Sequence, residues 1–177
     1  MAQTIAEIVP PLVLASHVFL AVIFLAVLGR NGWGKPIYDV LSRQAVLWGF
    51  LVALGAVLGS LFYSEAIGFE ACVLCWWQRV FLYPLAPIFA VAVWKRDRSV
   101  FNYAIVLALL ALVIGGYQEI SNLTGASLLT CTDAEGACSK VFVKEFGYIT
   151  IPVMSITVSL YILLLAWANK LFRTNND

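Results

Sequence analysis

Residues 45–64 read AVLWGFLVALGAVLGSLFYS, a run that contains no charged residue. A helix needs about 20 mostly apolar residues to cross the hydrocarbon core of a bilayer, so this run predicts a membrane-spanning helix. Four further stretches have the same character, and Arg79 in the third is the only charged residue within any of them. Strands of a closed barrel are about half as long, which favours helices. The five predicted spans are residues 8–29, 45–64, 71–94, 99–118 and 146–169.

The composition of the whole chain excludes several classes of protein. Of its 177 residues, 62% are hydrophobic and 12% are charged, and the net charge is +1. Soluble domains contain about 25% charged residues, and so few charges cannot cover a water-exposed surface. Disordered and nucleic-acid-binding proteins also need more charge. We therefore predict an all-α integral membrane helical bundle, surrounded by the lipid bilayer and without a nucleic-acid partner.

The first stretch, residues 8–29, is interpreted as a retained span rather than a cleaved signal peptide. Glu7 is the only charged residue ahead of it, and no A-x-A cleavage site follows. Pro10 and Pro11 are expected in the first turn of its helix, where a missing backbone N–H does no harm.

Basic residues concentrate in alternate connections, and this bias predicts the orientation. Only Lys140 and Lys144 lie in a connection on the opposite side. Because cytoplasmic loops carry the excess of Lys and Arg, we expect the N-terminus outside and the C-terminus in the cytoplasm. The residues assigned to the cytoplasmic side are Arg30, Lys35, Arg43, Lys95, Arg96, Arg98, Lys170 and Arg173.

Four cysteines are the main candidates for chemistry. Cys72 and Cys75 form a C-x-x-C pair at the start of the third span, and Cys131 and Cys138 lie between the fourth and fifth spans. Two crossings separate the pairs, so both lie on one face of the membrane. The predicted orientation makes this the outer face, where disulfides persist.

Three interpretations of the cysteines compete. Four thiols can bind structural zinc, although such sites usually hold small polar folds together and the first pair here borders the membrane. Two structural disulfides are the second interpretation. The third is a redox pair, because a C-x-x-C at a helix N-terminus favours a reactive thiolate.

Arg79 strengthens the redox interpretation. It follows Cys75 by four residues, so the two share one face of a helix. The helix N-terminus and the guanidinium both favour a thiolate at Cys75. An arginine within a span is a candidate functional residue, although its head group can also extend to the nearby interface, or donate hydrogen bonds to a bound cofactor. Haem, flavin and dinucleotide signatures are absent from the sequence, so a lipid-soluble carrier beside Cys75 is the acceptor that needs no further domain.

The stretch CVLCWWQR at residues 72–79 resembles the C-x-L-C-x-x-x-R motif of the DsbB/BdbC family of disulfide bond formation proteins. The downstream cysteine pair and the stretch FGYITIP at 146–152 are also similar to that family, and the resemblance covers about residues 45–172. It implies a four-helix core at 45–172. An extra N-terminal transmembrane helix and a cytoplasmic loop would occupy 1–44, with a cytoplasmic tail at 173–177.

The resemblance implies a quinone-dependent protein thiol:disulfide oxidoreductase of the bacterial cytoplasmic (inner) membrane. It would re-oxidise an extracytoplasmic, DsbA-like thioredoxin-fold carrier and reduce ubiquinone or menaquinone, which supports disulfide formation in exported proteins. By position, Cys131 and Cys138 would form the disulfide that the carrier attacks. Cys72 and Cys75 would re-oxidise that pair, with Cys75 meeting the quinone. Arg79 would help to bind the quinone, and no metal site is implied.

Four features depart from the family pattern. The first span is extra, and only six residues separate the two loop cysteines. Residues 117–119 read YQE where some relatives place a histidine, and Gln78 stands where others carry Glu. The last two differences concern the contacts of the quinone rather than the cysteine relay.

Two other functions stay open at the level of sequence. A relative of vitamin K epoxide reductase would also combine a helical bundle, two cysteine pairs and a quinone, but those proteins usually place the loop pair before the C-x-x-C. A non-enzymatic membrane scaffold would use its disulfides only to tie outer loops together.

Several residues within the spans carry structural expectations. His17 is expected to face the bundle and make a hydrogen bond rather than transfer protons. Gly55 and Gly59 form a G-x-x-x-G pattern that favours close helix packing rather than ligand binding. Trp76 and Trp77 are expected at the membrane interface.

Overall fold

The computed structural model describes residues 2–69, 72–124 and 146–174. Within these ranges, five helical segments are long and apolar enough to cross a membrane, which confirms the expected all-α membrane bundle. The segments are α1 (Ala2–Leu28), α3 (Ala45–Leu61) continued by the π-helical turn η1 (Phe62–Ala66), α4 (Val73–Leu82) followed by α5 (Leu85–Lys95), α6 (Phe101–Thr124) and α7 (Ile151–Thr174). A short helix, α2 (Lys35–Arg43), connects α1 to α3.

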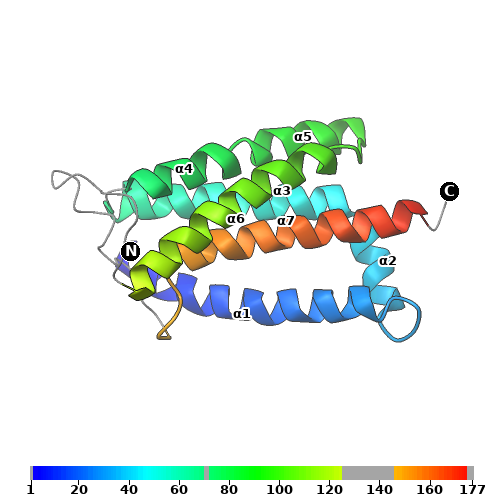
Figure 1. Ribbon diagram of the computed structural model, residues 1–177, viewed down its shortest axis with the longest axis horizontal. Helices are drawn as coiled ribbons and strands as arrows, with labels where there is room; N and C mark the ends of the chain where they lie inside the picture. Colours follow the sequence, from blue (N-terminus) through cyan, green and yellow to red (C-terminus); the bar gives the residue numbers. More distant parts are fainter. Residues whose placement is uncertain (1, 70–71, 125–145, 175–177) are drawn as a thin grey trace.

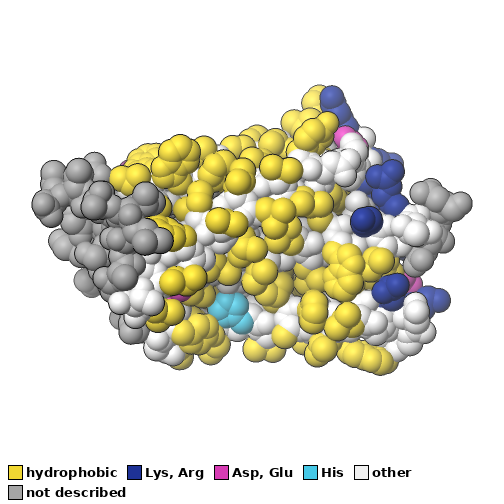
Figure 2. All heavy atoms as spheres, in the orientation of Figure 1, with side chains coloured by type: hydrophobic (Ala, Val, Ile, Leu, Met, Phe, Trp, Pro, Cys, Tyr) yellow, Lys and Arg dark blue, Asp and Glu magenta, His cyan; other side chains and the backbone are white. Residues whose placement is uncertain are grey.

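The helices run side by side between two ends of the molecule (Figure 1). The α1–α2 connection, the α5–α6 connection and the end of α7 gather at one end, where Figure 2 also shows the Lys and Arg side chains. We call this the basic end. The start of α4, which carries Cys72 and Cys75, lies at the opposite end, which we call the cysteine end. The basic connections therefore share one end, as the sequence predicts.

Several helices continue beyond the apolar stretches that predict them. The first helix begins at Ala2, so the expectation that Pro10 and Pro11 occupy its first turn is wrong. The fourth span extends to Thr124. The physical reason is that polar residues form the same helical backbone hydrogen bonds as apolar ones. Hydropathy therefore indicates which residues lie in the hydrocarbon core, and not where the helix ends.

The last helix starts later than expected, at Ile151 instead of residue 146. Phe146 and Gly147 have φ angles of 50° and 80°, which a right-handed helix does not allow. The hydroxyl of Thr150 accepts a hydrogen bond from the backbone N–H of Val153 at 3.3 Å and so caps the helix. The same hydroxyl donates to a carboxylate oxygen of Glu119 at 2.6 Å, which ties α7 to α6.

The third span is interrupted, and the connection before α3 is helical. Tyr83 and Pro84 separate α4 from α5 because Pro84 has no N–H with which to continue the helical hydrogen bonds. The helix α2, which the sequence analysis does not anticipate, buries Tyr38 and Leu41 against the bundle.

The buried apolar core lies mainly in the half of the bundle nearest the basic end. Phe89 and Phe101 pack edge to face with ring centroids 5.4 Å apart. A Cβ atom at Gly49 would lie 2.6 Å from the Phe89 ring, so only glycine lets α3 approach α5 this closely. Lipid chains are as apolar as this core, so such close packing is what holds membrane helices together. Other residues buried here are Leu85, Ala104, Ala108, Ile162 and Leu165.

Arg98 joins three segments at the basic end. Its guanidinium donates hydrogen bonds to the backbone carbonyls of Ser42 and Arg43, at 3.0 and 2.7 Å, where α2 ends. It also donates to the side-chain oxygen of Asn169 on α7 at 3.2 Å. A cation satisfies the carbonyls at a helix C-terminus and complements the helix dipole there.

The first helix is attached to α7 by polar contacts within the span. One ring nitrogen of His17 lies 2.8 Å from the Thr157 hydroxyl, and the other lies 3.2 Å from the Tyr148 hydroxyl. The Tyr161 hydroxyl donates to the backbone carbonyl of Ser16. The expectation that His17 faces the bundle through a hydrogen bond is confirmed.

Candidate functional site

The two cysteines of the C-x-x-C pair form the N-terminus of α4. Cys72 has extended backbone, and its sulfur caps the helix by accepting a hydrogen bond from the backbone N–H of Cys75 at 3.2 Å. The two sulfur atoms lie 2.7 Å apart. A disulfide bond is about 2.05 Å long, so only a small movement separates the present arrangement from a bonded pair.

A buried amide contacts both sulfur atoms. The side-chain NH₂ of Gln118 on α6 lies 3.3 Å from Cys72 Sγ and 3.6 Å from Cys75 Sγ. Its side-chain oxygen accepts a hydrogen bond from Gln78 at 2.6 Å, which fixes the orientation of the amide. Both glutamines are at least 95% buried. The pair therefore directs hydrogen-bond donors at the position where a thiolate would carry its charge.

Arg79 turns across the bundle toward α3. Its Nε atom donates to the Ser60 hydroxyl at 3.0 Å, and the Tyr83 hydroxyl donates to the same oxygen at 3.0 Å. The guanidinium also lies over the Trp76 ring, 5.2 Å from its centroid. Its head group is thus held against α3 by Ser60.

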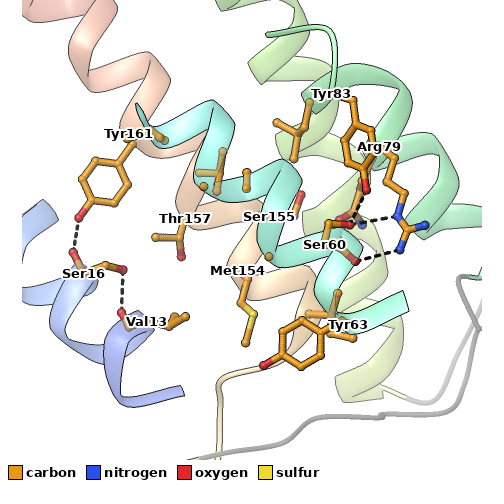
Figure 3. Close-up of a pocket in the computed structure, with 18 of the residues that line it drawn as sticks. Val13, Ser16, Ser60, Tyr63, Arg79, Tyr83, Met154, Ser155, Thr157 and Tyr161 are labelled. Atoms are coloured by element: carbon orange, nitrogen blue, oxygen red, sulfur yellow. Dashed lines mark hydrogen bonds between the residues drawn. The ribbon is translucent and has the colours of Figure 1, made fainter. Parts of the chain in front are cut away.

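A cavity of about 480 Å³ opens beside these residues. Figure 3 shows Ser60, Arg79 and Tyr83 on one side of it, Ser16 and Tyr161 on the other, and residues of α7 between them. Cys75 also contributes to its lining, whereas Trp76 and Trp77 do not. The remaining lining is mainly apolar and comes from α1, α3 and α7. The volume is in the range of small-molecule sites.

The small residues of α3 face this cavity. A Cβ atom added at Gly55 or Gly59 would meet nothing within 4 Å, and both glycines line the cavity together with Ala56. The expectation that the G-x-x-x-G pattern brings two helices together is therefore wrong. Small residues permit close approach of a helix, but here they leave space that no neighbouring helix fills.

A quinone fits the groups that line this cavity. The Ser155 hydroxyl is a buried oxygen for which no hydrogen-bond partner is found in the described part of the chain. Ser155 lines the cavity, as Arg79 does. A quinone presents two carbonyl acceptors on an apolar ring, and such donors in an apolar cavity match that pattern.

The structure brings together some predicted site residues and leaves others untested. Cys72, Cys75 and Arg79 lie close together at the cysteine end. Cys131 and Cys138 fall outside the described residues, so their pairing and roles remain predictions. The zinc interpretation needs all four cysteines and is untested for the same reason.

Two groups of contacts at this site are not among those expected from the sequence. Tyr83 belongs to the site, and a register argument finds it, because Cys75, Arg79 and Tyr83 are each four residues apart on one helical face. The contact of Gln118 with the cysteines joins residues more than 40 positions apart, and no local pattern contains it. The available signal was two polar side chains, Gln78 and Gln118, within otherwise apolar spans.

The chain is similar to known proteins over most of its length. The family described as "Disulfide bond formation protein DsbB" matches residues 42–169. An "SPbeta prophage-derived disulfide bond formation protein B" of Bacillus subtilis is 38% identical over 60% of this chain and 72% of its own. A "Probable disulfide formation protein" of Coxiella burnetii is 32% identical over 70% and 86%, and a "Probable disulfide formation protein C 2" of Bacillus anthracis is 32% identical over 75% and 93%. No solved structure matches the chain.

Proposed function

Because this chain belongs to the DsbB family of disulfide bond formation proteins, we propose that it oxidises a DsbA-like thioredoxin-fold carrier and reduces a membrane quinone. It is a multi-pass membrane protein with a role in disulfide bond formation. The observation that carries the finer proposal is that Cys75 and Arg79 line one apolar cavity within the bundle. The apolar lining suits a lipid-soluble acceptor better than a charged aqueous one.

The proposed electron path runs through both cysteine pairs. The dithiol of the carrier reduces the Cys131–Cys138 disulfide and becomes a disulfide itself. The resulting loop dithiol then reduces the Cys72–Cys75 disulfide, and that dithiol finally transfers two electrons and two protons to the quinone, which leaves as quinol. Each exchange needs a thiolate that attacks a disulfide sulfur, and the quinone supplies the strong final oxidant.

The residues around Cys75 support its role as the thiolate that meets the acceptor. The backbone N–H groups at the start of α4 and the amide of Gln118 both stabilise negative charge on sulfur. We assign Gln118 as a positioning residue and Gln78 as the group that holds its amide. Arg79 and Ser155 supply hydrogen-bond donors for the carbonyl oxygens of the quinone.

The proposed orientation places the cysteine end outside the cytoplasm. Apart from Arg79, the described Lys and Arg residues gather at the opposite end, and an excess of Lys and Arg favours the cytoplasmic side. In the proposed orientation the C-x-x-C pair faces the bacterial periplasm or its equivalent, where disulfides persist.

Purified protein in lipid nanodiscs tests the proposal. The wild type, supplied with a reduced thioredoxin-fold carrier and ubiquinone or menaquinone, is expected to oxidise the carrier and form one quinol per disulfide. Cys75→Ser is expected to abolish quinol formation, while Cys131 still forms a trapped mixed disulfide with the carrier. Normal turnover by Cys75→Ser contradicts the relay. If quinone oxidises no thiol of the wild type, the protein is a scaffold with structural disulfides instead.

A further inference from the structure

The helix α1 lies outside the part of the chain that matches the family, yet it lines the cavity. The match begins at residue 42, and α1 ends at Leu28. Val13, Ser16 and Phe19 of α1 nevertheless contribute to the lining. This chain therefore has a wall of the acceptor site that the family pattern does not supply.

Polar contacts hold α1 against α7. The His17–Thr157 contact is 2.8 Å long, and the Tyr161 hydroxyl bonds to the carbonyl of Ser16. Figure 3 shows the second of these contacts at the edge of the cavity, on the side away from Arg79. On α3, Gly55 and Gly59 have open space around them. The cavity thus extends between an anchored α1 and a face of α3 on which Gly55, Ala56 and Gly59 leave open space.

The lining of the cavity follows α3 over much of its length, and a cluster of polar side chains lies at one end of this path. Along α3 its lining runs from Ser60 to Trp48, which is about 18 Å at a rise of 1.5 Å per residue. The hydroxyl and guanidinium groups of Ser60, Tyr83 and Arg79 cluster at one end of this path. Leu51, Val52 and Gly55 continue it toward the basic end. A ligand with a polar head and a linear apolar chain matches this shape.

We propose that α1 forms the outer wall of a channel for the isoprenoid tail of the quinone. This channel lies between α1 and the face of α3 that carries Gly55, Ala56 and Gly59. This inference rests on the proposed function, because the head of the same ligand occupies the site beside Cys75. A phospholipid acyl chain has similar tail chemistry but is not expected to extend from the redox site. The dependence of activity on tail length separates these two occupants.

Two variants change the channel in opposite ways, and two matched variants change surfaces outside it. Gly55→Leu fills the face of α3, and Phe19→Ala removes a wall residue of α1. Gly116→Leu is the control for the first, because a Cβ at Gly116 also meets nothing within 4 Å and Gly116 does not line the cavity. Leu12→Ala is the control for the second, because Leu12 is 62% exposed on α1 and lies outside the lining.

The experiment measures KM for two ubiquinones, one without a tail and one with four isoprene units, in nanodiscs with a dithiol-reduced carrier. Gly55→Leu and Phe19→Ala are each expected to raise KM for the tailed quinone about fivefold or more, and to change KM for the tail-less quinone less than about twofold. Turnover with the tail-less quinone also shows that each variant is folded. The two control variants are expected to match the wild type with both quinones.

If Gly55→Leu and Phe19→Ala raise KM by the same factor for both quinones, the tail channel is overturned. It is also overturned if the control variants raise KM for the tailed quinone as much as these two variants do. A tail-independent KM in these variants, together with release of a bound phospholipid from Gly55→Leu in mass spectrometry, identifies an acyl chain as the occupant. Failure of the wild type to reduce either quinone overturns the proposed function itself, and the channel with it.

Discussion

Two glycines of α3 lie six residues apart and have opposite surroundings. At Gly49 the Phe89 ring of α5 fills the space that a side chain would take, whereas Gly55 faces the cavity and has nothing near it. The same residue type thus permits close packing in one half of the bundle and borders an open cavity in the other. Helix packing is concentrated toward the basic end, and the candidate chemistry toward the cysteine end.

Two arginines, Arg98 at the basic end and Arg79 at the cysteine end, also differ in their surroundings. Arg98 donates to two backbone carbonyls and an amide oxygen, all of which belong to the fold. Arg79 directs its hydrogen bonds at Ser60 alone in the described residues, and it lines the cavity. Both arginines join segments, since Ser60 lies on α3, but of the two only Arg79 also lines the cavity.

The largest effect on stability is expected for a substitution in the packed half of the bundle. Gly49→Val forces a side chain against the Phe89 ring, and overpacking of this kind costs about 3 kcal/mol of unfolding free energy. Gly55→Val is expected to change the unfolding free energy by less than about 0.5 kcal/mol. Steric trapping in bicelles measures both values. Equal destabilisation by the two substitutions removes the distinction between the halves.

Next in size is the loss of the Arg98 contacts. Arg98→Ala leaves the carbonyls at the end of α2 without their donor, and hydrogen bonds to charged groups contribute about 2 kcal/mol to stability. The same steric-trapping measurement reports this loss. The KM for quinone is expected to stay at the wild-type value because Arg98 does not line the cavity. A raised KM in Arg98→Ala contradicts this separation of roles.

A smaller effect is expected at the buried amide pair. Gln118→Leu removes the donor to both sulfurs and is expected to slow alkylation of Cys75 by a small reagent about tenfold, the loss that corresponds to one hydrogen bond. Gln78→Leu is expected to act in the same direction but less strongly, since it acts through Gln118. The double variant is then expected to show the same rate of Cys75 alkylation as Gln118→Leu alone. Additive effects show that the two glutamines act separately.

The smallest effect concerns an exposed carboxyl at the basic end. The hydroxyl and backbone N–H of Ser99 donate to Asp97 at 2.6 and 2.8 Å and hold the pKa of that carboxyl below its usual value. Because the folded pKa is lowered, the contribution to stability is present above the unfolded pKa and is lost as pH falls through the folded pKa. NMR titration is expected to show that Ser99→Ala raises the pKa of Asp97; an unchanged pKa refutes this cause.

The sequence predicts the spans well because charge is so scarce that each uncharged stretch is unambiguous. It also places Cys75 and Arg79 on one face, because helical spacing is a local property. The late start of α7 was missed, since positive φ at Phe146 and Gly147 depends on local backbone that hydropathy does not report. The opposite surroundings of Gly49 and Gly55 could not be predicted, because what faces a glycine is decided by distant segments.

The interruption at Tyr83–Pro84 has a mechanical consequence. An unbroken helix transmits a displacement along its length as a rigid rod, but a helix interrupted by proline bends at the missing hydrogen bond. Here the interruption separates α4, which carries the cysteine pair, from α5, which Phe89 locks into the core. The two parts of the span are therefore held separately, α4 by the contacts of Arg79 and Tyr83 with Ser60 and α5 by the packing of Phe89 against Phe101.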